Sequence, residues 1–212
     1  MPQIVTKTYF QKANELYIPL SVTAPVSNAS MQSPSNVSYL DNLCIKLEKS
    51  ILLNALGLTA YNELQTALAD INNPLNAKWK SLVQGESYDG KVWEGLSNDY
   101  SLIAYRIYEE FVTNTNDRLS AIGTTQVNPQ SASLVTPMYK IANANNNFIT
   151  KYQDGYLEYP FIYNDGEFID WFGNQETIEV SLYRYLNDKK ADFTSVDLTK
   201  YRVYESKNSF GI

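Results

Sequence analysis

Histidine is absent from the 212-residue sequence, and cysteine occurs once, as Cys44. Without histidine the chain cannot use Ser-His-Asp or Cys-His nucleophile activation, histidine-liganded metals, or the commonest general base near neutral pH. A single cysteine cannot form a disulfide within the chain. Because Cys44 lies beside Leu43 and Leu47 in a helix-patterned run, we expect a buried structural thiol.

Long apolar runs and phosphate-binding loops are also missing. No run approaches the ~20 apolar residues of a membrane helix, and the opening residues MPQIVTK lack the apolar part of a signal peptide. Neither a P-loop nor a dinucleotide-binding glycine motif occurs. We therefore expect a protein assembled in the cytoplasm, with no membrane contact, no cofactor, no metal and no catalytic residues.

The composition is that of a globular chain, with 44% hydrophobic and 19% charged residues. The net charge of −6 argues against a protein that grips nucleic acid by neutralising phosphates. Much of this acidity is compatible with a simple contribution to solubility.

Residues 39–115 carry the clearest helical pattern. A first helix is predicted from Asn36 or Ser38 to Gly57, and a second from Leu58 to the Asn73-Pro74 stop. A short helix should follow between Asn76 and Gly85, with Trp79, Leu82 and Val83 on one side. After a turn at 85–90, the spacing of Leu96, Tyr100, Ile103, Ile107 and Phe111 predicts a long central helix from Trp93 to about Thr115.

Connections flank this core. Residues 21–38 are polar and interrupted by proline, which predicts a loop or extended arm. Residues 116–135 read as a long uncovered connection, and Thr136-Pro137 should begin a helix that runs to about Gln153. We divide the chain into an N-terminal segment and arm (1–38), a helical core (39–155) and an aromatic-rich C-terminal extension and tail (156–212).

The C-terminal extension mixes aromatic residues with turns. Its rings could form a satellite core, a protein interface or a platform for stacking carbohydrate. The alternating tail 200–212 is typical of a strand that adds to the sheet edge of a partner, so its deletion is expected to weaken assembly and leave the helical fold intact. The candidate partner interface consists of Tyr201, Val203, Tyr204, Phe210, Ile212, Trp171 and Phe172.

Four runs in order resemble the head–tail connector adaptors of tailed bacteriophages. They are ILLNALGLTAYNEL (51–64), KWKSLVQG (78–85), WEGL (93–96) and IAYRIY (103–108), and the closing NSFGI (208–212) is also similar. The likeness is greatest to the branch found in phages of Bacteroidetes hosts, including crAss-like phages, and it covers roughly residues 36–155. The long N-terminal arm and the aromatic C-terminal third depart from the family pattern.

This resemblance implies a mainly α fold, a helical bundle, to which the residue patterns themselves add an extended N-terminal arm and an irregular, partly β C-terminal extension. It also implies a virion structural protein of the neck, which forms a homo-oligomeric ring, usually a dodecamer. The implied partners are the portal protein on one side and downstream tail or stopper proteins on the other. Duplex DNA would pass through the lumen without specific binding, and an acidic wall would help it to slide.

Carboxylate chemistry requires no histidine, so a glycan-processing or carbohydrate-binding protein built on the C-terminal third is the alternative. The acidic candidates are Glu109-Glu110, Asp165/Glu167/Asp170 and Glu176/Glu179. Neighbours such as Glu109 and Glu110 project ~100° apart on a helix and do not converge on one bond, so we expect a solvated face. Asp165-Gly166 favours a hairpin turn over a calcium loop.

Overall fold

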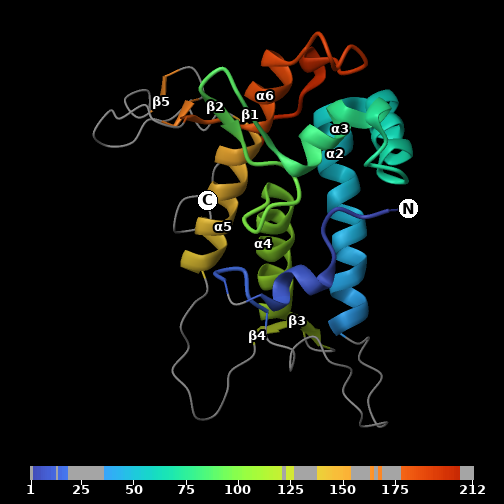
Figure 1. Ribbon diagram of the computed structural model, residues 1–212. Coiled ribbons are helices and arrows are strands. Elements are labelled where there is room, and N and C mark those ends of the chain that lie inside the picture. The colour runs from blue at the N-terminus through green and yellow to red at the C-terminus, as the bar shows by residue number, and fades with distance from the viewer. Residues whose placement is uncertain are drawn as a thin grey trace.

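The computed structural model describes residues 2–12, 14–18, 36–120, 123–126, 138–153, 163–164, 167–168 and 178–205. In these residues the chain is mainly helical, with short strands (Figure 1). The long helices α2 (Asn36–Leu68), α4 (Leu102–Asn116) and α5 (Met138–Tyr152) lie side by side, with α4 between the other two. This confirms the predicted helical class.

Helix α2 contains the two predicted helices, joined at Gly57 without a loop. Gly57 has φ 76° and ψ 171°, a backbone conformation that only glycine adopts readily. Leu52 and Leu56 before the break and Leu64 after it are all fully buried. The glycine therefore changes the direction of the chain while both parts keep their apolar sides in one core.

A compact unit follows α2. The 3-10 helix η2 (Pro74–Asn76) leads into α3 (Ala77–Gln84), whose Trp79, Leu82 and Val83 are buried as predicted. Strands β1 (Glu86–Tyr88) and β2 (Lys91–Trp93) then form an antiparallel hairpin. Because Trp93 ends a strand, the expected helical start at Trp93 is wrong: α4 begins at Leu102, and Tyr100 is 46% exposed.

Two glycines close the base of this hairpin. Gly85 and Gly95 both have positive φ, and a methyl group on Gly95 would lie 2.5 Å from the backbone nitrogen of Gly85. The two segments of the chain cross so closely that the backbone N–H groups of Leu96 and Ser97 donate to the carbonyl oxygens of Leu82 and Val83. Any side chain at either glycine would force these backbones apart.

The C-terminal part returns to the same core. Strand β7 (Ile178–Glu179) pairs parallel with β2 and gives the sheet order β1-β2-β7, and α6 (Leu182–Asp188) packs against it with Tyr185 stacked on Trp93. The 3-10 helix η4 (Leu198–Lys200) follows. Residues 178–205 thus contribute to the same hydrophobic core as the helices.

Two further hairpins lie outside this sheet. The predicted loop 116–135 contains β3 (Asp117–Ser120) paired with β4 (Gly123–Gln126), so it is not simply an uncovered connection. Strands β5 (Tyr163–Asn164) and β6 (Glu167–Phe168) pair around Asp165-Gly166, as the hairpin reading predicted. Residues 21–35 of the predicted arm and residues 127–135 of the predicted connection lie outside the described residues.

The N-terminal segment is part of the core as well. The 3-10 helix η1 (Lys7–Gln11) buries Tyr9 and Phe10, and Leu16 and Ile18 are also buried. Among the described residues, no helix combines the length and apolar character needed to span a bilayer.

Candidate partner interface

The C-terminal segment, residues 201–205, crosses the helices where the sequence predicts an interface. It contacts all three long helices: Arg202 donates its backbone N–H to the carbonyl oxygen of Asn54 on α2 (3.2 Å), and Arg106 on α4 lies 5.8 Å from the ring centre of Tyr204. Tyr204 also packs on Phe148 of α5. Residues 201–205 form no strand here.

Gln153, directly after α5, holds this segment through its main chain. The side-chain Oε1 of Gln153 accepts from the backbone N–H of Tyr204 at 2.6 Å, and Nε2 donates to the carbonyl oxygen of the same residue at 2.7 Å. The primary amide therefore pairs with Tyr204 as a neighbouring strand would. Gln153 is 8% exposed and both bonds are partly buried.

Two tyrosines of the segment point into the core. The ring of Tyr201 lies 4.8 Å from that of Tyr152, and its hydroxyl donates to the carbonyl oxygen of Tyr152 at 2.6 Å. The ring of Tyr204 lies 5.0 Å from Phe148, edge to face, and its hydroxyl accepts from Nδ2 of Asn54 at 2.7 Å. Burial, the largest cause, raises the pKa of Tyr152.

The predicted interface residues therefore separate into groups. Tyr201 and Tyr204 are half-buried against their own helices, whereas Val203 is 64% exposed. Trp171, Phe172, Phe210 and Ile212 lie outside the described residues. Of the predicted residues whose side chains are described, only Val203 is freely accessible, which leaves the partner role of the set as a prediction.

Asn54, Arg106 and Gln153 hold the segment and were missed by the sequence reasoning. No local pattern indicates them, because Asn54 and Tyr204 are 150 residues apart. A glutamine at a helix end and an asparagine on a helix surface are ordinary in sequence. Their role depends on a long-range contact.

A buried ion pair lies beneath the segment and corrects one expectation. Glu109 is 1% exposed and pairs with Arg106 on the same helix, so the expected solvated face at Glu109-Glu110 is wrong for Glu109. Arg106 also donates to Oδ1 of Asn145 on α5 at 3.4 Å and lies over the ring of Phe148. The pair therefore links α4 to α5 and is built into the core.

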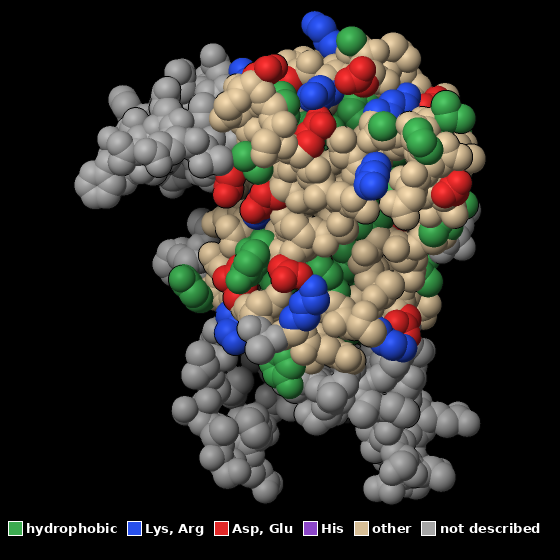
Figure 2. All heavy atoms as spheres, in the orientation of Figure 1, with side chains coloured by type: hydrophobic (Ala, Val, Ile, Leu, Met, Phe, Trp, Pro, Cys, Tyr) green, Lys and Arg blue, Asp and Glu red, His purple; other side chains and the backbone are tan. Residues whose placement is uncertain are grey.

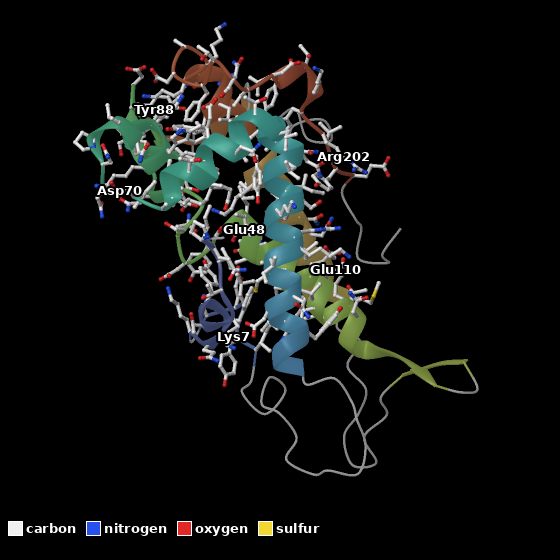
Figure 3. All side chains as sticks on the ribbon, turned by 90° about the vertical axis from the view of Figure 1, so that its right-hand side faces the viewer. Lys7, Glu48, Asp70, Tyr88, Glu110 and Arg202 are labelled. Atoms are coloured by element: carbon white, nitrogen blue, oxygen red, sulfur yellow. The ribbon has the colours of Figure 1, made fainter. Side chains whose placement is uncertain are left out.

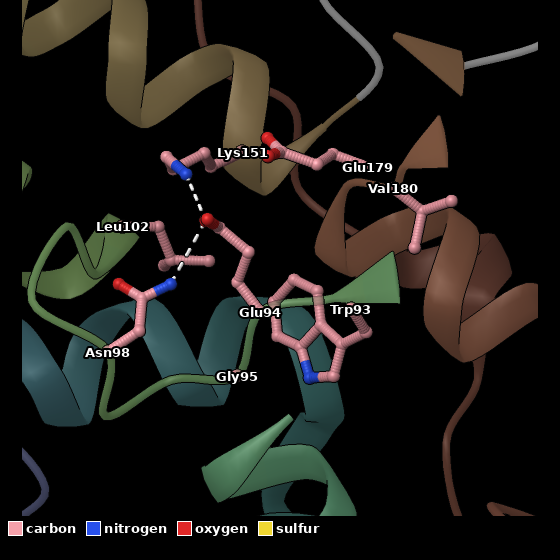
Figure 4. Close-up of a pocket in the computed structure, with 8 residues that line it drawn as sticks. All are labelled: Trp93, Glu94, Gly95, Asn98, Leu102, Lys151, Glu179 and Val180. Atoms are coloured by element: carbon pink, nitrogen blue, oxygen red, sulfur yellow. Dashed lines mark hydrogen bonds and ion pairs between the residues drawn. The ribbon is translucent and has the colours of Figure 1, made fainter. Parts of the chain in front are cut away.

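A small hollow opens beside β2, lined in part by Glu94, Asn98, Lys151 and Glu179 (Figure 4). The carboxylate of Glu94 accepts from Nζ of Lys151 and from Nδ2 of Asn98, the latter at 3.0 Å. The space holds about one water molecule. A site for a sugar or other small ligand needs ~300 Å³ or more.

The other acidic candidates do not converge in the described part. Glu110 accepts from Nδ2 of Asn114 at 3.1 Å on the helix surface, and Glu179 is exposed. The side chains of Asp165, Glu167, Asp170 and Glu176 lie outside the described residues. No group of three or more potential metal ligands occurs among the side chains that are described.

The two tryptophans whose side chains are described serve packing. Trp79 lies edge to face on Phe193 at 5.3 Å, and the indole of Trp93 donates to the carbonyl oxygen of Leu82 at 2.9 Å. Both tryptophans are 3% exposed and cannot stack on a sugar. Cys44 is a free thiol, 1% exposed, which confirms the buried structural cysteine.

A polar network joins the hairpin β1–β2 to α6. Asp188 pairs with Lys91 (3.0 Å) and Arg184 (3.3 Å), while Glu86 pairs with Lys189 (3.0 Å). The hydrogen bonds and the lysine partner lower the pKa of Glu86 although burial, the largest single cause, acts to raise it. The network fixes the hairpin and balances its charges locally.

No family model, no curated protein and no solved structure matches the chain.

Proposed function

We propose that the chain is a virion structural protein, a head–tail connector adaptor of a tailed bacteriophage. Identical subunits form a ring, with twelve copies as in the resembled family, between the portal protein and the downstream tail or stopper proteins. Duplex DNA passes through the lumen without specific binding, and the chain has no enzymatic role. Its place is the neck of the virion, after assembly in the host cytoplasm.

One observation carries the proposal: the four runs that resemble the adaptor family contribute to a single packed unit. Leu56 and Leu64 of the first run, Leu82 of the second, Leu96 of the third and Ile107 of the fourth all belong to one buried cluster. The second and third runs meet at Gly85 and Gly95. Residues that define a family through packing are expected to behave in this way.

The charge distribution also supports a passive conduit. Figure 2 shows one face of the molecule, on which Lys and Arg side chains are interspersed with Asp and Glu and form no continuous basic area. Combined with a net charge of −6, such a surface does not favour tight binding to phosphates. DNA can slide past a wall of this kind.

The test is native mass determination of the full chain, alone and after addition of the portal oligomer from the same genome. Ring-sized oligomers, or stoichiometric addition to the portal, are the expected results. A chain that stays monomeric and also ignores the portal contradicts the proposal. A glycan titration followed by tryptophan fluorescence separates the carbohydrate alternative, which alone predicts saturable quenching.

The structure sharpens the truncation experiment. Deletion of residues 200–212 removes Tyr201 and Tyr204 from the core, so the loss of assembly could follow from lost stability. A chain that ends at Glu205 keeps all contacts described for 201–205 and removes only 206–212. We expect this shorter deletion to weaken addition to the portal while the thermal midpoint stays within about 2 °C of that of the full chain.

A further inference from the structure

The C-terminal segment is held in the way that peptide-binding proteins hold extended ligands. Its main chain is bonded at Arg202 N, Tyr204 N and Tyr204 O, and the partner groups come from Asn54 and Gln153. Main-chain bonds of this kind supply affinity whatever side chains are present. Selectivity has to come from the rings.

The rings supply a simple rule of recognition. Tyr201 and Tyr204 point inward, and each hydroxyl has a defined partner, the carbonyl oxygen of Tyr152 and Nδ2 of Asn54. Arg202 and Val203 between them are exposed. The groove is therefore expected to select a segment with two tyrosines three positions apart and to accept any residues between them.

The place of the segment in the chain makes it separable. Leu198–Lys200 is a 3-10 helix that contacts α2 and α6 of its own chain, and beyond it Arg202, Val203 and Glu205 are exposed. A segment at the surface can leave its groove while α2, α4 and α5 keep their contacts with one another. Exchange of such elements between identical chains is a low-cost route to association.

We propose that the groove formed by Asn54, Arg106, Phe148, Tyr152 and Gln153 is a peptide-binding site that accepts Tyr201–Tyr204 of a second copy of this chain. The second copy is chosen because an identical segment makes identical contacts. The proposal rests on the proposed function in one respect: a ring keeps neighbouring copies close enough for exchange.

In an isolated subunit the chain's own segment has the advantage. Its linkage gives it an effective concentration of the order of millimolar, so a free second copy rarely displaces it. Exchange becomes visible when the segment of one chain and the groove of another are disabled. Each chain then retains only one functional half.

The experiment mixes two full-length variants. The groove variant carries Asn54→Ala and Gln153→Ala and keeps the tyrosines, while the segment variant carries Tyr201→Ala and Tyr204→Ala and keeps the groove. We expect a 1:1 heterodimer by native mass on mixing and none from either variant alone. In the matched control, the groove variant is mixed with Glu205→Ala instead of the segment variant, because Glu205 is exposed and lies outside the groove contacts. This mixture should give at least tenfold less heterodimer.

A peptide gives a second readout. Fluorescein-labelled peptide 199–206 should bind the segment variant saturably. Its affinity for the wild-type chain should be at least tenfold lower. A peptide that carries Tyr204→Ala should also bind the segment variant at least tenfold more weakly. Circular dichroism checks that the variants are folded, and if the double variant is not, the single variant Tyr204→Ala replaces it. Absence of both the heterodimer and saturable peptide binding overturns the proposal.

The two proposals fail in different ways. A wild-type chain that adds to the portal while complementation and peptide binding are absent leaves the adaptor function standing and removes the exchange. Complementation by a chain that ignores the portal does the reverse.

Discussion

The two terminal segments of the described chain bind the same helix with different chemistry. Lys7 and Arg202 mark them on opposite sides of α2 in Figure 3. On the N-terminal side, the buried carboxylate of Glu48 accepts from the backbone N–H groups of Ile4 and Val5 at 2.9–3.1 Å. On the C-terminal side, the side-chain hydrogen bonds come from the amides of Asn54 and Gln153, and the guanidinium of Arg106 lies over the ring of Tyr204.

Because of this difference, only the N-terminal attachment uses an ionisable carboxyl group as its hydrogen-bond acceptor. Glu48 is 4% exposed, and burial raises its pKa while the bonds from Val5 and Ile4 act in the opposite direction. Gln153 and the tyrosines make comparable bonds without a charge. The N-terminal attachment should therefore depend on pH, and the C-terminal one should not.

Removal of Glu48 is expected to have the largest effect on this comparison. Glu48→Ala leaves the N–H of Val5 buried and the N–H of Ile4 partly buried, without their acceptor, which costs about 2–3 kcal/mol of unfolding free energy. Urea denaturation followed by far-UV circular dichroism measures it. Lys49→Ala, on the exposed side of α2, is the control and should change the free energy by less than ~0.5 kcal/mol.

Removal of the Tyr204 side chain is expected to cause the second-largest loss of unfolding free energy. Tyr204→Ala loses the ring contacts with Phe148 and Tyr152 and the hydroxyl bond from Asn54, with a cost of about 2 kcal/mol because the side chain is only half-buried. The same urea titration applies, with Glu205→Ala unchanged. A cost equal to that of the control would mean that the C-terminal segment is not held in solution.

A smaller effect should distinguish the two attachments by pH. Because the folded-state pKa of Glu48 is raised above its ordinary 4.5, its stabilising contribution is complete below 4.5 and is lost as pH rises through the folded-state pKa. Relative to Glu48→Gln, the wild-type chain should thus gain stability as the solution is acidified from about pH 7.

The matched pair for that titration is the wild-type chain and Tyr204→Phe, which keeps the ring and removes the hydroxyl. Their difference in unfolding free energy should stay constant over the same range, since the amides of Asn54 and Gln153 that bond Tyr204 do not ionise. A parallel change in both pairs would contradict the distinction.

The smallest expected signal comes from Cys44. Burial raises the pKa of its thiol to about 12, so a disulfide reagent at about pH 8 should react only when the structure opens. Lys7 of the N-terminal segment contributes to the electrostatics of this thiol. With urea added to equalise global stability, Glu48→Ala should react faster than Tyr204→Ala; equal rates would show that the N-terminal segment does not cover Cys44.

Residue patterns predicted the helices well and the contacts between distant segments poorly. The spacing of Leu40, Leu43 and Leu47 and the break at Gly57 are local signals, and they led to α2. The start of α4 was placed too early because Trp93 and Leu96 happen to continue its apolar spacing while facing the core from a strand and a turn.

The candidate interface shows the same limit. The alternating apolar residues of 200–212 predict a strand for a partner. In the described part of this tail, Tyr201 and Tyr204 pack on their own helices, and Gln153 supplies the pairing that a strand edge would give. Burial of Glu109 likewise depends on Arg106 and on the approach of α5, which no spacing within α4 indicates.

The close contact between Gly85 and Gly95 fixes the base of the β1–β2 hairpin, whereas its turn, the tip, projects away from that base. The tip residues Asp89 and Gly90 are exposed, and the base is sealed below them by the bonds from Leu96 and Ser97. Extra residues inserted between Asp89 and Gly90 lengthen a loop whose ends are already pinned, at a cost that grows only slowly with length. The tip is thus a natural attachment point for a reporter tag that leaves the packed core unchanged.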